Sequence, residues 1–182
     1  SSNKGEGWSG WKAVAGCNHY ALALYRITLG LLLTSELVLR FRFLHPFYCD
    51  EGTLPLRLLE PQTDSLYKAI CVHCLSGSLL FQAILLALQV LLAVCLTLGY
   101  RTKLGSIGSW FLYLSLTLRN TWLSFILDRY FHYLLWYAIF LPLNRHRWSV
   151  DSFLARRTHT PQTGQFCNFA TFCLKLQVVW IY

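Results

Sequence analysis

Long apolar stretches alternate with polar connections along this chain, which range from a tight basic turn at residues 99–103 to a long polar connection at residues 40–77. Five such stretches are present, at residues 20–39, 78–98, 104–118, 125–143 and 166–182. Each is about 15 to 20 residues long, close to the length that an α-helix needs to cross a hydrocarbon core of roughly 30 Å. The fifth stretch is still apolar at Tyr182, so we expect the parent gene to continue beyond it. The pattern therefore predicts helices that cross a membrane.

The composition agrees with this reading. Hydrophobic residues make up 55% of the 182 residues, and charged residues only 13%, against about 25% charged residues in soluble domains. A soluble domain of this length could not bury so much apolar surface. We therefore predict an all-α fold, a polytopic transmembrane bundle of about four to five spans with the last span truncated. Residues 1–19 form a polar arm, and residues 20–182 form one membrane domain.

The positive charge of the chain lies mostly at the ends of the apolar stretches. The formal net charge is +8, but this placement favours lipid headgroups or partner subunits over nucleic acid. The basic residues expected to make such contacts are Arg101, Lys103, Arg145, Arg147, Arg156 and Arg157. With five spans, eight Lys/Arg share the side of the N-terminal arm and six lie opposite. This count favours an N-terminus on the inner face of the membrane.

Several ionisable residues fall inside or beside the predicted spans. Arg26 and Glu36 lie in the first, and Asp128, Arg129 and His132 lie at the start of the fourth. A charge within a bilayer is costly, so these five residues are the candidate polar cluster. Arg26 could instead extend to the headgroups. Asp128, Arg129 and His132 could equally form a charged helix entrance at the interface.

Asp128 is expected to pair with a basic side chain, because an unpaired carboxylate near lipid is costly. The sequence offers Arg129, Arg119 and Arg26 as partners. Small residues in the third span, Gly105 and Gly108 with their neighbouring serines, indicate close contact between helices. Gln82 and Gln89, seven residues apart in the second span, are expected to bond to neighbouring helices.

The seven cysteines are scattered and odd in number, which does not indicate a disulfide framework. Most of them are expected to be small buried hydrophobes. Cys71 and Cys74 have the spacing of a CxxC motif. No second CxxC accompanies them, so the signal for metal or redox chemistry is slight. The residues predict no metal site and do not identify a cofactor.

Several short motifs also follow one another in a characteristic order. They are Tyr25-Arg26, 46–52 (PFYCDEG), 98–102 (LGYRT), 118–120 (LRN), Asp128, 140–143 (FLPL) and 148–151 (WSVD). In this order, the chain from Tyr20 onward resembles the HTTM domain family, the membrane domain shared with vitamin K-dependent γ-carboxylases. The resemblance implies a helical membrane domain. In the carboxylases it also implies carboxylation of glutamate with vitamin K hydroquinone, CO2 and oxygen.

The chain departs from the carboxylase pattern at two places. Asp128, within ILDRY, stands where the carboxylases have the histidine of their Asn-Asn-His-Ser-Tyr segment. Their catalytic lysine follows the span that here ends at Tyr182, and Lys175 comes too early to replace it. The resemblance therefore assigns no catalytic residue to this chain.

Three hypotheses of function follow. The first is a non-catalytic structural or accessory subunit of a larger membrane complex, with lipids and other membrane proteins as its partners. The second is the N-terminal part of a γ-carboxylase-like enzyme. The third is transport or quinone binding centred on Arg26, Glu36, Asp128 and His132.

Overall fold

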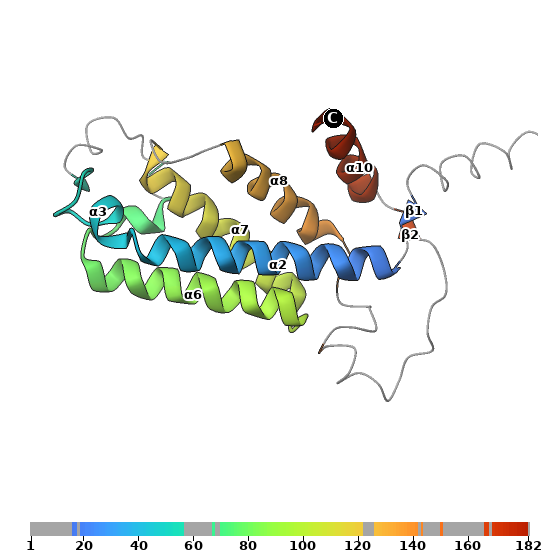
Figure 1. Ribbon diagram of the computed structural model, residues 1–182, viewed down its shortest axis with the longest axis horizontal. Coiled ribbons are helices and arrows are strands. Elements are labelled where there is room, and N and C mark those ends of the chain that lie inside the picture. Colours follow the sequence, from blue (N-terminus) through green and yellow to red (C-terminus); the bar gives the residue numbers. More distant parts are fainter. Residues whose placement is uncertain are drawn as a thin grey trace, which may run out of the picture.

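A computed structural model describes most of the central part of the chain (Figure 1). The described residues are 16–17, 19–56, 67, 70–121, 126–141, 143, 150, 166–167 and 169–181. Five longer helices are present: α2 (His19–Phe41), α6 (Leu79–Leu98), α7 (Thr102–Arg119), α8 (Ile126–Phe140) and α10 (Phe169–Ile181). The prediction of an all-α fold is confirmed for this part of the chain.

Three short elements accompany the helices. They are α3 (Leu44–Tyr48), the 3-10 helix η2 (Val72–Cys74) and an antiparallel pair of two-residue strands, β1 (Gly16–Cys17) with β2 (Phe166–Cys167). Figure 1 shows that α2, α6, α7 and α8 run in alternating directions. As a result, α3 and η2 lie at the end of the bundle where α2 and α7 finish, and the turn between α6 and α7 lies at the opposite end.

Two of the described helices are long and apolar enough to cross a membrane. They cover Tyr20–Phe41, with 22 residues, and Leu79–Leu98, with 20 residues. The helices α7, α8 and α10 are shorter, with 18, 15 and 13 residues. The structure thus supports two candidate spans by length and composition, and the larger number of four to five stays a prediction.

The buried face of α2 follows the helical period. Its buried side chains recur every three or four residues, at Leu22, Arg26, Leu29, Leu33 and Leu37, which places them on one side of the helix. This side packs mainly on α6 and also contacts α8, while α7 packs on both α6 and α8. The shared core consists mostly of leucine side chains.

Small residues allow the closest helix contacts. A Cβ atom at Gly30 of α2 would lie 2.9 Å from the backbone nitrogen of Thr97 on α6. A Cβ atom at Gly105 of α7 would lie 3.4 Å from the carbonyl oxygen of Leu92 on α6, and Ser106 and Ser109 are buried on the same helix. The predicted small-residue contact surface of α7 is confirmed.

The turn between α6 and α7 ends one helix and starts the next. Gly99 adopts φ 76°, in the left-handed region that favours glycine, and its N–H donates to the carbonyl of Cys95 at 2.9 Å. Arg101 follows with φ 44°. The predicted tight basic turn is therefore present, with Arg101 and Lys103 both exposed.

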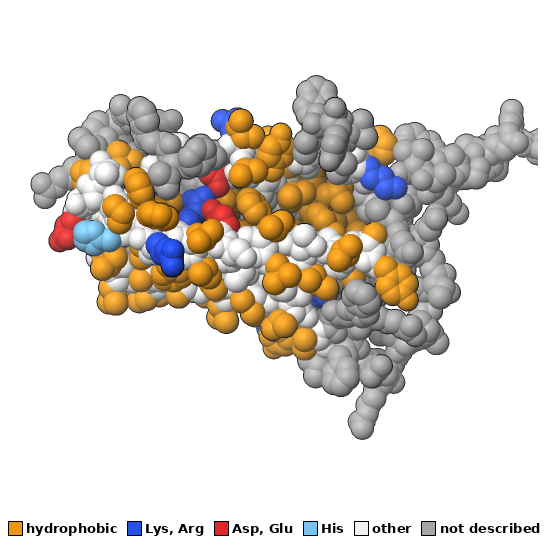
Figure 2. Space-filling model, viewed as in Figure 1, with side chains coloured by type: hydrophobic (Ala, Val, Ile, Leu, Met, Phe, Trp, Pro, Cys, Tyr) orange, Lys and Arg blue, Asp and Glu red, His pale blue; other side chains and the backbone are white. Residues whose placement is uncertain are grey.

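The face of the bundle that Figure 2 shows carries many apolar side chains and few charged ones. Exposed large hydrophobic side chains occur on all five longer helices, among them Leu24, Leu31 and Leu39 of α2, Leu80, Ile84 and Leu91 of α6, Leu104 and Ile107 of α7, Tyr133 and Trp136 of α8, and Phe169 and Leu176 of α10. A water-soluble bundle rarely exposes apolar side chains over so many faces. This exterior agrees with the two candidate spans.

Candidate functional site

Arg40 is the centre of a buried ionic network at the end of the bundle near α3. Its Nε donates to Glu36 one turn earlier on α2, its Nη1 donates to the hydroxyl of Tyr48 at 2.8 Å, and its Nη2 donates to Oδ1 of Asp128 at 2.6 Å. The Arg40, Glu36 and Asp128 side chains are only 13%, 24% and 6% exposed. One guanidinium thus joins α2, α3 and the first turn of α8.

Tyr113 connects α7 to the same network. Its hydroxyl donates to Oδ1 of Asp128 at 2.5 Å, and its ring centroid lies 5.6 Å from the Cζ atom of Arg40. The guanidinium over the ring adds a cation–π attraction. Asp128 therefore accepts hydrogen bonds from a charged and a neutral donor, which offsets the cost of burying its carboxylate.

His132 lies one turn after Asp128 on α8 and faces α7. Its Nδ1 is 2.8 Å from the carbonyl oxygen of Asp128. A carbonyl oxygen only accepts, so Nδ1 carries the proton in this contact. Its Nε2 is then left as an acceptor, 3.5 Å from the hydroxyl of Thr117. The ring also contacts Tyr113, with centroids 5.1 Å apart.

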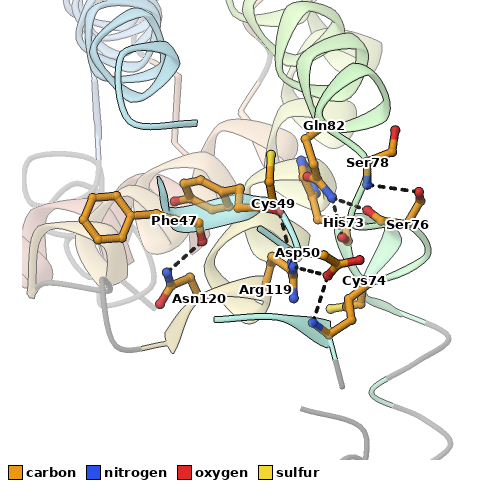
Figure 3. Close-up of polar contacts among 12 residues, drawn as sticks. Phe47, Cys49, Asp50, His73, Cys74, Ser76, Ser78, Gln82, Arg119 and Asn120 are labelled. Atoms are coloured by element: carbon orange, nitrogen blue, oxygen red, sulfur yellow. Dashed lines mark hydrogen bonds and ion pairs between the residues drawn. The ribbon is translucent and has the colours of Figure 1, made fainter. Parts of the chain in front are cut away.

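A second polar layer lies outside this network, around Arg119 and Asp50 (Figure 3). Nη2 of Arg119 lies 3.5 Å from Oδ1 of Asp50 and donates to the carbonyl of Tyr48 at 3.3 Å. Asn120 donates to the carbonyl of Phe47 at 3.0 Å. The last turn of α7 thereby holds the segment around α3 in place.

His73 and Ser115 join η2 to α7 in this outer layer. Ser115 Oγ lies 2.9 Å from both the backbone nitrogen and Nδ1 of His73. Burial, together with the nearby Arg119 guanidinium, lowers the pKa of His73 to about 4. The amide of Gln82 donates to the carbonyls of His73 and Ser76 at 2.7 and 2.6 Å, so it bonds to the loop, not to a neighbouring helix.

The structure brings together three of the five residues of the predicted polar cluster, namely Glu36, Asp128 and His132. Arg26 is fully buried but lies ten residues before Glu36 on α2, about 15 Å away along the helix axis. Arg129 is exposed. The other predicted contact residues, Arg145, Arg147, Arg156 and Arg157, lie outside the described residues.

The expected partners of Asp128 require a correction. The carboxylate pairs with a basic side chain, as predicted, but this is Arg40 and not Arg129, Arg119 or Arg26. Arg119 pairs with Asp50 instead. The first apolar stretch ends at Leu39, which places Arg40 in the polar connection that follows, whereas α2 continues to Phe41.

Three members of the network were missed from the sequence: Arg40, Tyr48 and Tyr113. One signal could have identified Arg40, because it follows Glu36 by four residues and such pairs face each other on a helix. Tyr113 carries no comparable signal, since an aromatic residue in an apolar stretch is read as core. Tyr48 lies in the connection between the first two apolar stretches, where nothing in the sequence marks it as a partner of Arg40. The CxxC reading also changes, because Cys71 and Cys74 form a disulfide.

The donor set of the described residues does not resemble a metal site. No group of three or more His, Cys, Asp or Glu side chains that could hold a metal ion occurs in the described ranges. The chain matches no family model, and neither curated proteins nor solved structures include a significant match to it.

Proposed function

We propose that this chain is an integral membrane helical bundle of four to five spans that acts as a non-catalytic accessory subunit of a larger membrane complex. The HTTM-like order of its motifs is part of the proposal. The observation that carries it is the contrast between an apolar exterior and buried charges that pair with one another inside the bundle.

The internal pairing suits a structural role. Arg40 donates to three different side chains, and Asp128 receives both Arg40 and Tyr113 on one oxygen. A buried charge is tolerated in a bilayer when such partners surround it, and removing one partner strands the other. The network therefore works as a lock that fixes α2, α3, α7 and α8 at one end of the bundle.

The apolar exterior suits contact with lipid or with other membrane helices. In Figure 2, acidic and basic side chains meet between α2 and α8 on a face that is otherwise mostly hydrophobic. Exposed leucines and isoleucines extend along α2 and α6 on either side of the buried seam between them. Helices in lipid associate through packing of such surfaces, and this supports a subunit that docks onto a partner.

The ends of the bundle support an orientation in the membrane. Arg101 and Lys103 lie at the same end as the start of α2, which the positive-inside rule assigns to the inner face. The Cys71–Cys74 disulfide lies at the other end, and disulfides persist in oxidising compartments outside the cytosol. The two observations are independent and favour the same orientation, with the N-terminus inside.

The accessory role is tested by photo-crosslinking in native membranes. A diazirine-bearing residue replaces one exposed side chain at a time: Leu31, Ile84, Leu91, Ile107 or Trp136. At least one face should crosslink to another membrane protein, while the other faces crosslink to lipid. Leu86, which is fully buried on α6, is the matched control and should crosslink only within the chain. Lipid adducts alone at every exposed position would refute the accessory role.

A second arm separates the accessory subunit from a carboxylase-like enzyme. Reconstituted membranes containing only this chain should give no vitamin K epoxidation above background, because Asp128 stands where the resemblance places the active-site histidine and Lys175 comes too early to be the family's catalytic lysine. Without a general base, the rate falls by a factor of about 10² to 10⁴. Turnover above background would overturn the proposal, and its loss in Lys175→Ala with the fold intact would make that lysine the base.

A further inference from the structure

The Cys71–Cys74 disulfide lies in a turn that other interactions already hold. The Cα atoms are 5.2 Å apart and only three residues separate the two cysteines. Within the turn, the backbone N–H of Cys74 donates to the carbonyl of Cys71 at 3.0 Å, and Leu75 donates to Val72 at 3.2 Å. A crosslink that closes so short a loop restricts the unfolded chain less than a long-range crosslink does.

The surroundings keep the turn in place without the disulfide. Ser115 on α7 accepts the backbone N–H of His73 at 2.9 Å, and Gln82 on α6 donates to the carbonyl of His73 at 2.7 Å. Neither contact involves a sulfur atom. The turn can therefore keep its position on α6 and α7 when the two sulfurs are reduced.

The two sulfurs differ in their environment. Cys71 is fully buried, and its Sγ lies 3.5 Å from the carbonyl oxygen of Ser115, an acceptor that a reduced S–H could use. Cys74 is partly exposed in the outer polar layer (Figure 3). An attacking thiolate needs access to one sulfur. Here the accessible sulfur is that of Cys74. Cys71 is the leaving group, and its reduced thiol could donate a hydrogen bond to the carbonyl of Ser115.

We propose that Cys71 and Cys74 form a thiol–disulfide exchange site that reacts with external thiols through Cys74. An external thiolate attacks Cys74 Sγ, the Cys71–Cys74 bond breaks, and Cys71 leaves and takes up a proton. A second external thiolate then attacks the external sulfur of the mixed disulfide and releases Cys74, which is protonated in turn. Two external thiols are oxidised to one disulfide, and the protein disulfide is reduced to two thiols.

This inference goes beyond the proposed accessory function and stands without it. A thiol–disulfide site at this end would lie at the same end of the bundle as the Arg40 network and the Asp50–Arg119 pair. The reacting thiol could belong to a small molecule or to a dithiol protein, because both present the same chemistry to Cys74. The two sources are distinguished by experiment.

The test uses the full chain in mild detergent, equilibrated with glutathione buffers of varied ratio or with reduced thioredoxin. After acid quench and alkylation, peptide mass spectrometry reports the state of each cysteine. The Cys71–Cys74 pair should interconvert reversibly while the tryptophan fluorescence of the fold is unchanged. Faster reduction by glutathione would indicate a small-molecule thiol as the reacting partner, and faster reduction by thioredoxin would indicate a dithiol protein. A pair that reacts only after denaturation overturns the proposal.

Single-cysteine variants test which sulfur is attacked. With oxidised glutathione, Cys71→Ser should carry glutathione on Cys74, and Cys74→Ser should label Cys71 at least about tenfold more slowly because that sulfur is buried. Cys49→Ser is the control, since Cys49 is buried outside the motif, and it should leave the exchange of the pair unchanged. Equal labelling of Cys71 and Cys74 would contradict the assigned direction of attack.

Discussion

Arg40 on α2 and Asp128 on α8 are 88 residues apart in the chain, yet their side chains meet at 2.6 Å in the interior of the bundle. The same guanidinium holds Glu36 and Tyr48, so the pair is the point where four segments are fixed together. A buried ion pair is sensitive to the loss of either member, because the remaining charge stays buried with fewer partners to offset its desolvation.

Substitution of Asp128 by Asn should lower the stability of the detergent-solubilised protein. The Arg40 guanidinium would keep Glu36 but lose one of its two carboxylate partners, and a largely buried charged donor left without its acceptor costs about 1–3 kcal/mol. The free energy of unfolding, measured by denaturant titration with tryptophan fluorescence, reports the change. Arg129→Gln, on the neighbouring exposed position, is the control and should stay within about 0.5 kcal/mol of the parent chain. If Asp128→Asn lowers the free energy of unfolding no more than Arg129→Gln does, the Arg40–Asp128 pair does not stabilise the bundle.

The helices, the basic turn and the small-residue face of α7 could be predicted from the sequence, because each follows from local patterns of apolar, basic and small residues. The network could not be predicted in full, because the Arg40–Asp128 pair depends on how distant helices meet. The end of α2 also mattered, since placing Arg40 in a loop hid its i, i+4 relation to Glu36. The segment around Asp50 read as a polar connection, and its contacts with Arg119 appear only in three dimensions.

Gly30→Ala should destabilise the contact between α2 and α6. The added Cβ would lie 2.9 Å from the backbone nitrogen of Thr97, and a backbone atom cannot move aside as a flexible side chain can. Overpacking of this kind costs about 1–3 kcal/mol, more than the helix propensity of alanine returns. Gly105→Ala is the matched control, because its Cβ would meet atoms at 3.4 Å. Thermal unfolding should show a lower Tm for Gly30→Ala only, and equal Tm values would show that the helices do not cross this closely.

Gln89→Leu should raise stability, and Gln82→Leu should lower it. Among the described residues, neither amide atom of Gln89 has a hydrogen-bond partner, although the side chain is fully buried. Gln82 instead donates to His73 and Ser76. Removing an unpaired buried amide gains about 1 kcal/mol, and removing a paired one leaves carbonyl groups unsatisfied. Denaturant titration measures the change in the free energy of unfolding for each variant. Destabilisation by Gln89→Leu would show that the Gln89 amide makes a stabilising hydrogen bond.

Stability should fall as the pH is lowered from about 6.5 towards 4. His73 has a pKa of about 4 in the folded chain, because burial disfavours its charged form, against 6.5 when it is unfolded. Between these values the unfolded chain binds the proton and the folded chain does not, so unfolding becomes easier as the pH falls. At a pH below both pKa values, this shift lowers the free energy of unfolding by about 3 kcal/mol. Denaturant titrations across this pH range measure the slope.

The histidine responsible is identified by two variants. His73→Gln should flatten the slope between pH 6.5 and 4, because it removes the group whose pKa changes on folding. His45→Gln is the matched control, because the His45 side chain is 57% exposed in the segment around α3. If His73→Gln keeps the full slope, another group controls the acid sensitivity.

The central claim is that the helices cross the membrane, so that the two ends of the helical bundle lie in different compartments. Topology mapping tests this claim most directly. N-glycosylation acceptor tags are inserted after Glu51, after Tyr100 and after Thr121, which lie at opposite ends of the bundle. In microsomal membranes, the tags after Glu51 and Thr121 should be glycosylated, and the tag after Tyr100 should not. Three tags in the same state would mean that α6 and α7 do not cross the membrane, and this would contradict the account.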